Sequence, residues 1–334
     1  MPHVPAPRKL HSPGLTLLAL AALAGLLAVG AADLSGSPSR EAVLLSQFTA
    51  PAFVSGLMLI GACLALRRPR MAAAMALACM VLSTAMAPQL VPAGARAERD
   101  SPTVRLYLAN IYIRNENVTA IARSIREAEA DIVILTEINS RILLDDARMA
   151  RILPEHPHRL NSAVVGGPYR MNHGVIASRY PLQGELIEHL DGIAAMHART
   201  QTPLGPLSLT GAHLTRPWPF LHHGAQDHQL DRLIERLGRI EGPHVVAGDF
   251  NSTPATGIGQ RLRLEGGLAS APSWPGTWPS VLPAPFRIGI DNVFVSRDLS
   301  ISARTLAVPT GSDHSPVIVE IRRARPARVG RSAP

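Results

Sequence analysis

The first 96 of the 334 residues carry long apolar stretches with almost no charge inside them, whereas the remainder mixes polar and apolar residues. Three of these stretches approach the roughly 20 residues that an α-helix needs to cross the hydrocarbon core of a membrane. They lie at about residues 14–32, 48–66 and 71–91, and the third is the weakest. The sequence therefore predicts a membrane anchor of three transmembrane helices over residues 1–96.

The basic residues around these stretches predict the orientation of the anchor. The loop over residues 33–46 has one basic and two acidic residues, so it carries no positive excess. The basic residues instead lie before the first stretch and between the second and third: Arg8, Lys9, Arg67, Arg68 and Arg70. Because cytoplasmic loops are enriched in Lys and Arg, we expect a multi-pass inner-membrane protein. Everything after about Ala97 then faces the periplasm or the exterior.

Three alternatives to this topology remain open. The basic start and apolar middle of the first stretch also fit a cleaved signal peptide, which would leave the following domain outside as well. If the third stretch does not insert, the domain faces the cytoplasm instead. The small-x-small spacing of Ala95-Arg96-Ala97 would permit release of the domain from the anchor.

The net charge of +8 is unevenly distributed. Residues 97–321 hold 21 arginines and 23 acidic residues, whereas five further arginines follow in residues 322–334. A nucleic-acid-binding domain is expected to be basic itself, so this distribution weakens a general nucleic-acid function. We therefore predict a soluble domain over 97–321 and a basic disordered tail over 322–334. Cys63 and Cys79 lie in apolar stretches and are expected to be buried.

The soluble part alternates predicted strands with predicted helices. Residues 104–108 alternate with strand periodicity, and residues 131–135 form a continuous apolar run. Asn117 is the expected N-cap of a helix between them, with Val118, Ile121 and Ile125 on one face. Further strands are expected at 174–178, 207–212, 244–247, 291–295 and 316–321, and a helix from Ala225. Residues 271–285 read as a proline-rich surface loop.

Polar side chains follow or precede these strands: Asn110, Glu137, His213, Asp249, Asn251, Asp313 and His314. Carboxylates, carboxamides and imidazoles are the groups that hold a hard cation, orient a water molecule and move a proton. Any one of them alone would be a turn former, a cap or a surface residue. Their repeated position at strand ends favours a catalytic site on a rigid scaffold.

Taken in order, these segments resemble the endonuclease/exonuclease/phosphatase superfamily, with the deoxyribonuclease-like fold, in a membrane-anchored bacterial form. The resemblance covers about residues 103–321, and each short motif gains weight from its place in the family order. It implies an α/β four-layer sandwich of two packed mixed β-sheets with outer helices. The matching stretches are 108–110, 135–137, 173–181, 211–214, 248–251, 290–293 and 312–316.

The resemblance also implies a metal site and a substrate site. Glu137 is implied as the main Mg²⁺ ligand, assisted by Asn110 and Asp313, and Mn²⁺ is a possible substitute. Magnesium prefers a few oxygen ligands together with water and substrate phosphate. Asn110 and Asn251 are expected to contact the substrate, and Arg179 is a further candidate for its phosphate.

The catalytic roles implied by the resemblance belong to His213, Asp249, Asn251, Asp291 and His314. Asp249 and Asn251 would orient the attacking water, and Asp291 would raise the basicity of His314. His213 would stabilise the transition state or protonate the leaving oxygen. The assignment of the acid remains open. Many relatives have a histidine after the aspartate, where this chain has Asn292.

The predicted activity is hydrolysis of a phosphodiester or phosphomonoester, such as a lipid headgroup, by metal-assisted attack of water. An extracytoplasmic nuclease and a non-catalytic ligand-binding relative are the alternatives. No protein partner can be inferred. His222, His223 and His228 do not form a known ligand pattern and are expected to be solvated. Packing is the expected role of four aromatic residues: Trp218, Phe220, Trp274 and Trp278.

Overall fold

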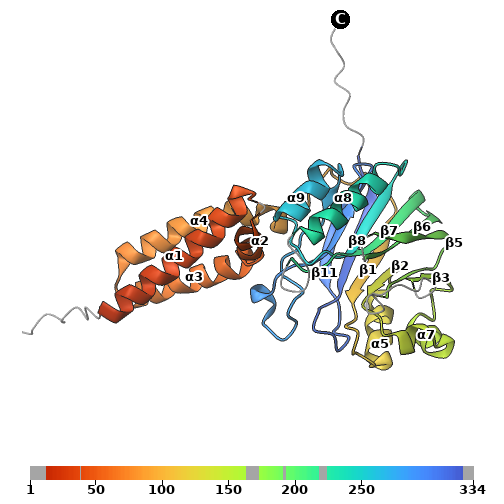
Figure 1. Cartoon of the computed structure of the whole chain (residues 1–334), viewed down its shortest axis with the longest axis horizontal. Helices are drawn as coiled ribbons and strands as arrows, with labels where there is room; N and C mark the ends of the chain where they lie inside the picture. The colour runs from red at the N-terminus through yellow and green to blue at the C-terminus, as the bar shows by residue number, and fades with distance from the viewer. Residues whose placement is uncertain (1–12, 38, 163–172, 191–192, 218–223, 326–334) are drawn as a thin grey trace, which may run out of the picture.

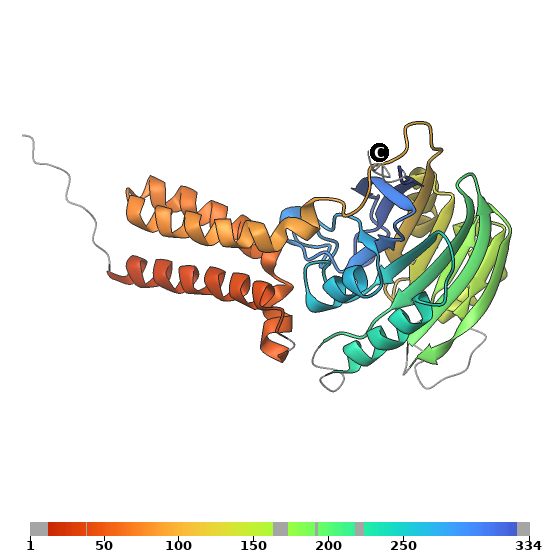
Figure 2. The ribbon, with the colours of Figure 1, turned by 90° about the horizontal axis from the view of Figure 1, so that it is seen from above.

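The computed structural model describes residues 13–37, 39–162, 173–190, 193–217 and 224–325. A bundle of long helices projects from one side of a larger α/β domain (Figures 1 and 2). The bundle consists of α1 (Pro13–Ser35), α3 (Thr49–Ala65) and α4 (Pro69–Leu90), with the short helix α2 (Arg40–Ser46) joining α1 to α3. Packing is expected at residues 218 and 220 and solvent exposure at 222 and 223, and these four residues lie outside the described ranges.

The three long helices lie within a few residues of the three predicted apolar stretches. By length and composition, α1 and α4 can each cross a membrane, and α2 with α3 forms a third candidate span that is bent by 59°. Gly56 of α3 allows close approach to α4, because an added Cβ would collide with the sulfur of Cys79. Small residues commonly bring membrane helices together in this way. Both cysteines are free and buried, as expected.

Helix α2 lies in the segment that the sequence analysis treated as a loop. The side chain of Ser39 accepts a hydrogen bond from the backbone N–H of Ala42, which caps the first turn. The helix ends just before Gln47, and the chain then bends into α3 at Phe48. This turn is therefore an ordered part of the protein on the side that faces the α/β domain (Figure 2).

The α/β domain contains two six-stranded sheets, and both mix parallel with antiparallel pairs. The first has the order β11-β12-β1-β2-β4-β3, and the second has the order β5-β6-β7-β8-β10-β9. The strands of the first sheet are β1 (Val104–Asn110), β2 (Ile132–Thr136), β3 (His158–Asn161), β4 (Val175–Ser178), β11 (Leu299–Leu306) and β12 (Val317–Arg323). Those of the second are β5 (Leu182–Leu190), β6 (Ile193–Thr202), β7 (Gly205–His213), β8 (His244–Asp249), β9 (Ala269–Ser270) and β10 (Asp291–Val295).

Alternation along the strands explains how the sheets pack. In β1, Leu106 and Leu108 point into the core between the two sheets, whereas Tyr107 and Ala109 point to the outer face. Side chains of successive strand residues alternate between faces, so each central strand contributes to two apolar layers. Leu209 and Val245 contribute to the inner layer from the second sheet. Burial of these apolar side chains on both faces is the main stabilising contribution.

Helices cover the two outer faces. On the first sheet lie α5 (Val118–Ala128), α6 (Ser140–Leu143) and α7 (Asp146–Ile152), and on the second lie α8 (Ala225–Leu237) and α9 (Gly257–Leu264). The Asn117 side chain caps α5 by accepting from the N–H of Ala120, as expected. The short helix η2 (Ala284–Phe286) interrupts the proline-rich loop. The predicted four-layer α/β fold is confirmed.

Two boundaries differ from the sequence prediction. The predicted tail begins at residue 322, but Arg322 and Arg323 belong to β12. Arg322 also donates to the backbone carbonyl of Ser101. The predicted anchor ends at residue 96, but the N–H of Ala93 already bonds to the carbonyl of Ser270 in the domain. The next residues are held in the same way, because the N–H of Glu98 bonds to the carbonyl of Arg323 and Ala97 bridges to Ala324. Long-range backbone pairing, which local composition does not reveal, orders both segments.

Candidate active site

Strand pairing brings the polar strand ends to one edge of the domain. In parallel strands β1 and β2, Asn110 lies opposite Thr136, so Glu137 follows immediately beyond that pair. In parallel strands β7 and β8, His213 lies opposite Asp249. The antiparallel strand β10 then places Asp291 beside Asp249. Because the carboxyl ends of parallel strands lie side by side, residues as far apart in the chain as Asn110 and Asp291 converge.

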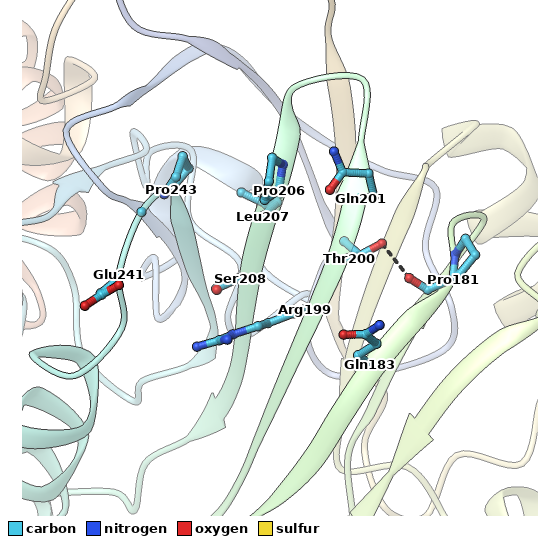
Figure 3. A pocket seen from close by; sticks show the side chains of 11 residues that line it. Pro181, Gln183, Arg199, Thr200, Gln201, Pro206, Leu207, Ser208, Glu241 and Pro243 are labelled. Carbon is cyan, nitrogen blue, oxygen red and sulfur yellow. Dashed lines mark hydrogen bonds between the residues drawn. The ribbon is translucent and has the colours of Figure 1, made fainter.

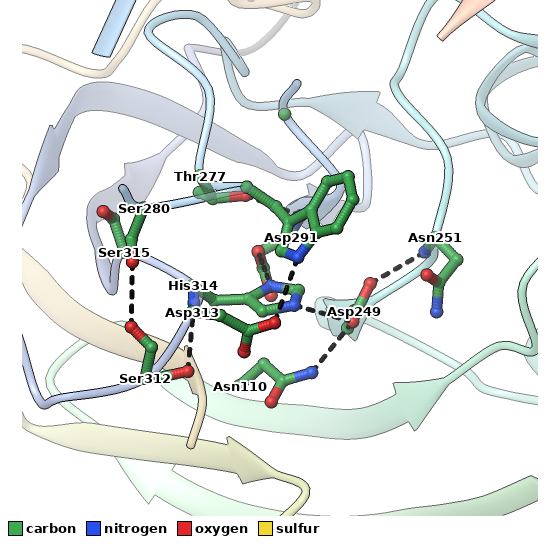
Figure 4. A network of polar contacts seen from close by, with 12 residues as sticks. Asn110, Asp249, Asn251, Thr277, Ser280, Asp291, Ser312, Asp313, His314 and Ser315 are labelled. Carbon is green, nitrogen blue, oxygen red and sulfur yellow. Dashed lines mark hydrogen bonds and ion pairs between the residues drawn. The ribbon is translucent and has the colours of Figure 1, made fainter. Parts of the chain in front are cut away.

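Asn110 connects the two sheets. Its side-chain amide donates to Glu137 Oε1 and to Asp249 Oδ2, each at 3.0 Å. Its Oδ1 accepts from the backbone N–H of Tyr112 at 2.9 Å, which fixes the orientation of the carboxamide. Figure 4 shows the bond from Asn110 to Asp249, which also contacts Asn251 and His314. One carboxylate from each sheet is thereby held at a common point.

His213 lies beside the same two carboxylates. Its Nε2 is 3.7 Å from Glu137 Oε1 and 3.6 Å from Asp249 Oδ2. The carboxamide nitrogen of Asn251 lies 3.3 Å from that Nε2 and donates to the carbonyl of Leu214 at 2.8 Å. Asn251 thus holds the His213 ring beside the carboxylates of Glu137 and Asp249.

His314 and Asp291 form a close pair. His314 Nδ1 lies 2.8 Å from Asp291 Oδ2, and its Nε2 lies 3.9 Å from Asp249 Oδ2. Burial alone would lower the pKa of His314, but the charge and hydrogen bond of Asp291, with the charges of Asp249 and Asp313, raise it to about 10. Burial and the neighbouring charge of Asp291 raise the pKa of Asp249. The site therefore holds imidazole and carboxylate groups with strongly altered proton affinity.

Backbone strain accompanies this arrangement. Glu137 and Asn251 have φ angles of +51° and +47°, in the left-handed region that residues other than glycine rarely adopt. Asparagine tolerates this region better than most residues, whereas glutamate does not share that preference. Such conformations cost about 1–3 kcal/mol and occur preferentially at functional sites. Glu137 directly follows β2 and Asn251 lies two residues beyond the end of β8, so the strained turns aim both side chains into the cluster.

Asp313 occupies a separate position within the site. Its Oδ2 accepts a hydrogen bond from the indole N–H of Trp278 at 3.2 Å, and its Oδ1 is buried without a partner among the described residues. It is not part of the acid–histidine groups whose ligand atoms lie within 4.8 Å of one another. Asp313 therefore neighbours His314 but lies outside the cluster formed by Glu137, His213 and Asp249.

The residues around Glu137 fit a divalent cation. Glu137, His213 and Asp249 each offer a ligand atom within a common 4.8 Å, and a second such group comprises Asp249, Asp291 and His314. Two carboxylates converge on the neutral amide of Asn110. A hard cation would offset this concentration of negative charge, and oxygen donors of this kind suit magnesium.

Arg179 is not brought to this site. It follows β4, whose Ser178 pairs with Ile132 at the start of β2, whereas Glu137 follows the end of β2. The guanidinium pairs with Glu155 and lies 3.7 Å from Asp131. Antiparallel pairing of β4 with β2 thus places Arg179 at the opposite end of these strands from Glu137. The motif around it belongs to the fold, but its position does not support a contact with the substrate phosphate.

Asn292 has a structural contact close to the site. Its side-chain amide donates to the carbonyl of Ser252 at 2.8 Å and to that of Gly289 at 3.2 Å. It therefore fixes the loop that follows Asn251. This contact explains how asparagine is accommodated where many relatives have a histidine.

Trp278 is a residue of the site that sequence reasoning assigned to packing alone. The loop that carries it is bonded to the segment after β11, because Ser280 N–H donates to the carbonyl of Asp313 at 2.7 Å and Ser315 N–H to that of Thr277. Its ring lies 6.5 Å from that of His314. The only signal in the sequence was an aromatic residue in a proline-rich loop, which does not indicate a site.

A further large cavity lies away from the acid–histidine cluster. A cavity of about 670 Å³ is lined by Gln183, Arg199, Ser208 and Glu241, among others (Figure 3). Ser208 pairs with His244 at the start of β8, whereas the acid–histidine cluster lies at the end of β8. This cavity therefore lies at the opposite edge of the second sheet from the candidate active site.

Comparisons with solved structures show the same fold. An endonuclease/exonuclease/phosphatase from Bacteroides vulgatus aligns with a TM-score of 0.56 and 17% identity, over 66% of this chain and 99% of that chain. One from Beutenbergia cavernae aligns at 0.51 and 20% identity, over 66% and 72%. A humanized D. rerio TDP2 aligns at 0.51 and 14% identity, over 66% and 98%.

Comparison with family models assigns the chain directly. No curated protein shows a significant match to the sequence. The model of the Endonuclease/Exonuclease/phosphatase family matches residues 108–314, which include every predicted site residue. Members of that family are typically hydrolases that act on phosphoesters. The chain belongs to the Endonuclease/Exonuclease/phosphatase family.

Proposed function

We propose that this protein is a membrane-anchored phosphoester hydrolase that depends on a divalent cation, with Mg²⁺ as the first candidate and Mn²⁺ as the second. The observation that carries the proposal is the convergence of Glu137, Asp249 and His213 with the His314–Asp291 pair. These groups come from both sheets, yet lie within one cluster. The substrate class is a phosphodiester or phosphomonoester.

Glu137 and Asn110 are the residues proposed to hold the cation, with Asp313 close by. When bound, the cation supplies charge neutralisation at the phosphoryl oxygens and the leaving group. Asp249, whose Oδ1 accepts from the backbone N–H of Asn251 at 2.8 Å, orients the attacking water. His213 is placed to donate a proton to the leaving oxygen, and His314 stabilises negative charge while Asp291 fixes its ring.

The anchor is proposed to cross the membrane three times, with α2 and α3 as one broken span. The N-terminus and the turn at Arg67–Arg70 then lie on the cytoplasmic side. The α/β domain lies on the periplasmic side of an inner membrane. Support comes from the helix lengths and from the distribution of basic residues.

The test is hydrolysis of a phosphoester panel by the purified full chain, with Mg²⁺, with Mn²⁺ and after chelation. The panel comprises bis(4-nitrophenyl) phosphate, 4-nitrophenyl phosphate, phospholipid vesicles and single-stranded DNA. We expect Glu137→Gln to lower turnover by about 100-fold or more, because it removes one ligand charge without changing size. Leu144→Ala is the control, since this side chain is 72% exposed and follows the end of α6. Full turnover by Glu137→Gln, or cation-independent turnover, would remove the proposal.

A further inference from the structure

A cavity of about 340 Å³ connects the candidate active site to the helical anchor. Asn251 and His314 line it from the candidate active site. Leu44 of α2 lines it from the anchor, together with Gln47 and Phe48 in the turn that follows. Its volume lies in the range of ligand pockets in proteins. Residues more than 200 positions apart therefore share one cavity, and the anchor forms part of its wall.

The wall of this cavity is mostly apolar. Phe48 is 48% exposed, although its side chain is large and hydrophobic. Arg216 adds a positively charged side chain to the lining, near the two polar residues of the catalytic cluster in the same cavity. The remaining apolar members are Leu44, Pro217, Trp278, Ile288 and Ile290. A polar end beside an apolar wall is complementary to an amphipathic ligand.

Hydrogen bonds hold the anchor against this side of the domain. Gln47 Oε1 accepts from the backbone N–H of Thr253 at 3.1 Å, and Gln47 Nε2 donates to Ser252 Oγ at 3.4 Å. Both partners follow Asn251 directly in the chain. At the end of α4, the carbonyl of Gln89 accepts from the N–H groups of Ser273 and Trp274. These contacts place the cavity at the domain-facing ends of the helices (Figures 1 and 2).

We propose that this cavity binds an acyl chain of a membrane phospholipid whose phosphate occupies the catalytic cluster. The inference rests on the proposed function and assigns its substrate class. If the long helices cross the bilayer, their domain-facing ends lie at the headgroup level, where the phosphate of a phospholipid is also found. A water-soluble phosphoester has no apolar chain to match Leu44 and Phe48. Continuity of the cavity with the catalytic residues favours the lipid.

Binding tests the cavity independently of turnover. The full chain is held in amphipol, which leaves no free detergent, and titrated by calorimetry with dodecyl phosphate and with ethyl phosphate in the presence of Mg²⁺. Burial of the longer chain should make dodecyl phosphate bind at least about tenfold more tightly. Phe48→Ala should reduce this ratio by roughly fivefold, whereas Leu45→Ala, a change in the adjacent helix α2 outside the cavity lining, should preserve it.

Equal ratios in the wild type and in Phe48→Ala would show that dodecyl phosphate binds elsewhere, and would overturn the proposal. The thermal unfolding midpoint of each variant shows whether it is folded. Turnover of dodecyl and ethyl 4-nitrophenyl phosphate supplies the second readout. If neither ester is hydrolysed yet the binding ratio holds, the proposed function fails and the lipid-binding cavity stands. If both esters are hydrolysed at equal efficiency, the proposed function stands and the cavity assignment fails.

Discussion

Asp291 contacts His314 at 2.8 Å and is grouped with Asp249 and His314, whereas Glu137 is grouped with His213 and Asp249. In Asp291→Asn the ring keeps a neighbour of the same size but loses the charge that raises its pKa. We expect kcat to fall by about 100-fold or more with a smaller change in KM. The pH–rate profile gives the specific signature.

In the wild type, the raised pKa keeps His314 protonated until the pH approaches about 10. Removal of the Asp291 charge lowers the pKa of His314. The limb of the pH–rate profile that reflects deprotonation of His314 should therefore shift to lower pH. Asn292→Ala, which affects the adjacent buried side chain, is the matched control and should leave that limb in place. An unshifted limb in Asp291→Asn would show that the pair does not control the titration of His314.

His156 allows a prediction about stability that is independent of the catalytic cluster. Its Nε2 bonds to the carbonyl of Ala130 at 2.9 Å, and its buried Nδ1 has no partner among the described residues. Burial is the main cause that lowers the pKa of His156. The unfolded chain therefore takes up a proton as the pH falls below about 6.5, whereas the folded protein resists it.

The free energy of unfolding should accordingly fall as the pH drops from 7.5 toward 5. His156→Gln, which keeps a donor for Ala130, removes this contribution and should reduce the loss. Thermal unfolding midpoints of both proteins at the two pH values measure the difference. If the unfolding midpoints of wild type and variant fall equally between the two pH values, protonation of His156 does not cause the loss of stability.

Gly248 shows how closely β7 and β8 approach at the site. It lies opposite Ala212, and an added Cβ would collide with the Ala212 backbone carbonyl. Gly248→Ala must therefore separate two central strands and displace Asp249. We expect a loss of about 2 kcal/mol or more in unfolding free energy, together with a loss of turnover.

Gly257→Ala is the matched control for this substitution. Gly257 is the first residue of α9, and an added Cβ there meets nothing within 4 Å. Its effect should stay within about 1 kcal/mol, because alanine also restricts the unfolded chain. Chemical unfolding of the full chain compares the two variants. Similar stabilities would mean that β7 and β8 can separate without cost.

The central strands could be predicted from local pattern, whereas several outer ones could not. The continuous apolar run of β2 and the buried strand β8 are typical of strands covered on both faces. Strand β6 instead contains Met196, His197, Ala198 and Arg199, and its identity depends on pairing with β5 and β7. The two-residue strand β9 is too short for any periodic signal. Such strands form because a neighbour offers backbone hydrogen bonds, and their sequences carry little independent preference.

The arrangement of helices and domain predicts opposite exposure of two turns. If the long helices cross a membrane, the turn at Arg68 and the segment at Glu98 lie on opposite sides. Arg68→Cys should be labelled by a membrane-impermeant maleimide only after cell lysis, whereas Glu98→Cys should be labelled in intact cells with a permeable outer membrane. The native Cys63 and Cys79 are buried, so the unmodified chain provides the background. Labelling of both positions in intact cells would contradict the three-span topology.

The sequence alone determined the apolar N-terminal helices, the α/β class and most members of the acid–histidine cluster. It could do so because burial on both faces marks the central strands, and because polar residues that end such strands meet at a sheet edge. The positions of Arg179, Trp278 and Phe48 were decided only in the tertiary structure. Antiparallel pairing of β4 with β2 placed Arg179, and backbone bonds between two loops placed Trp278. Packing of the N-terminal helices against the domain placed Phe48. These contacts join segments that are distant in the chain, and local residue patterns contain no information about which distant backbone will be their partner.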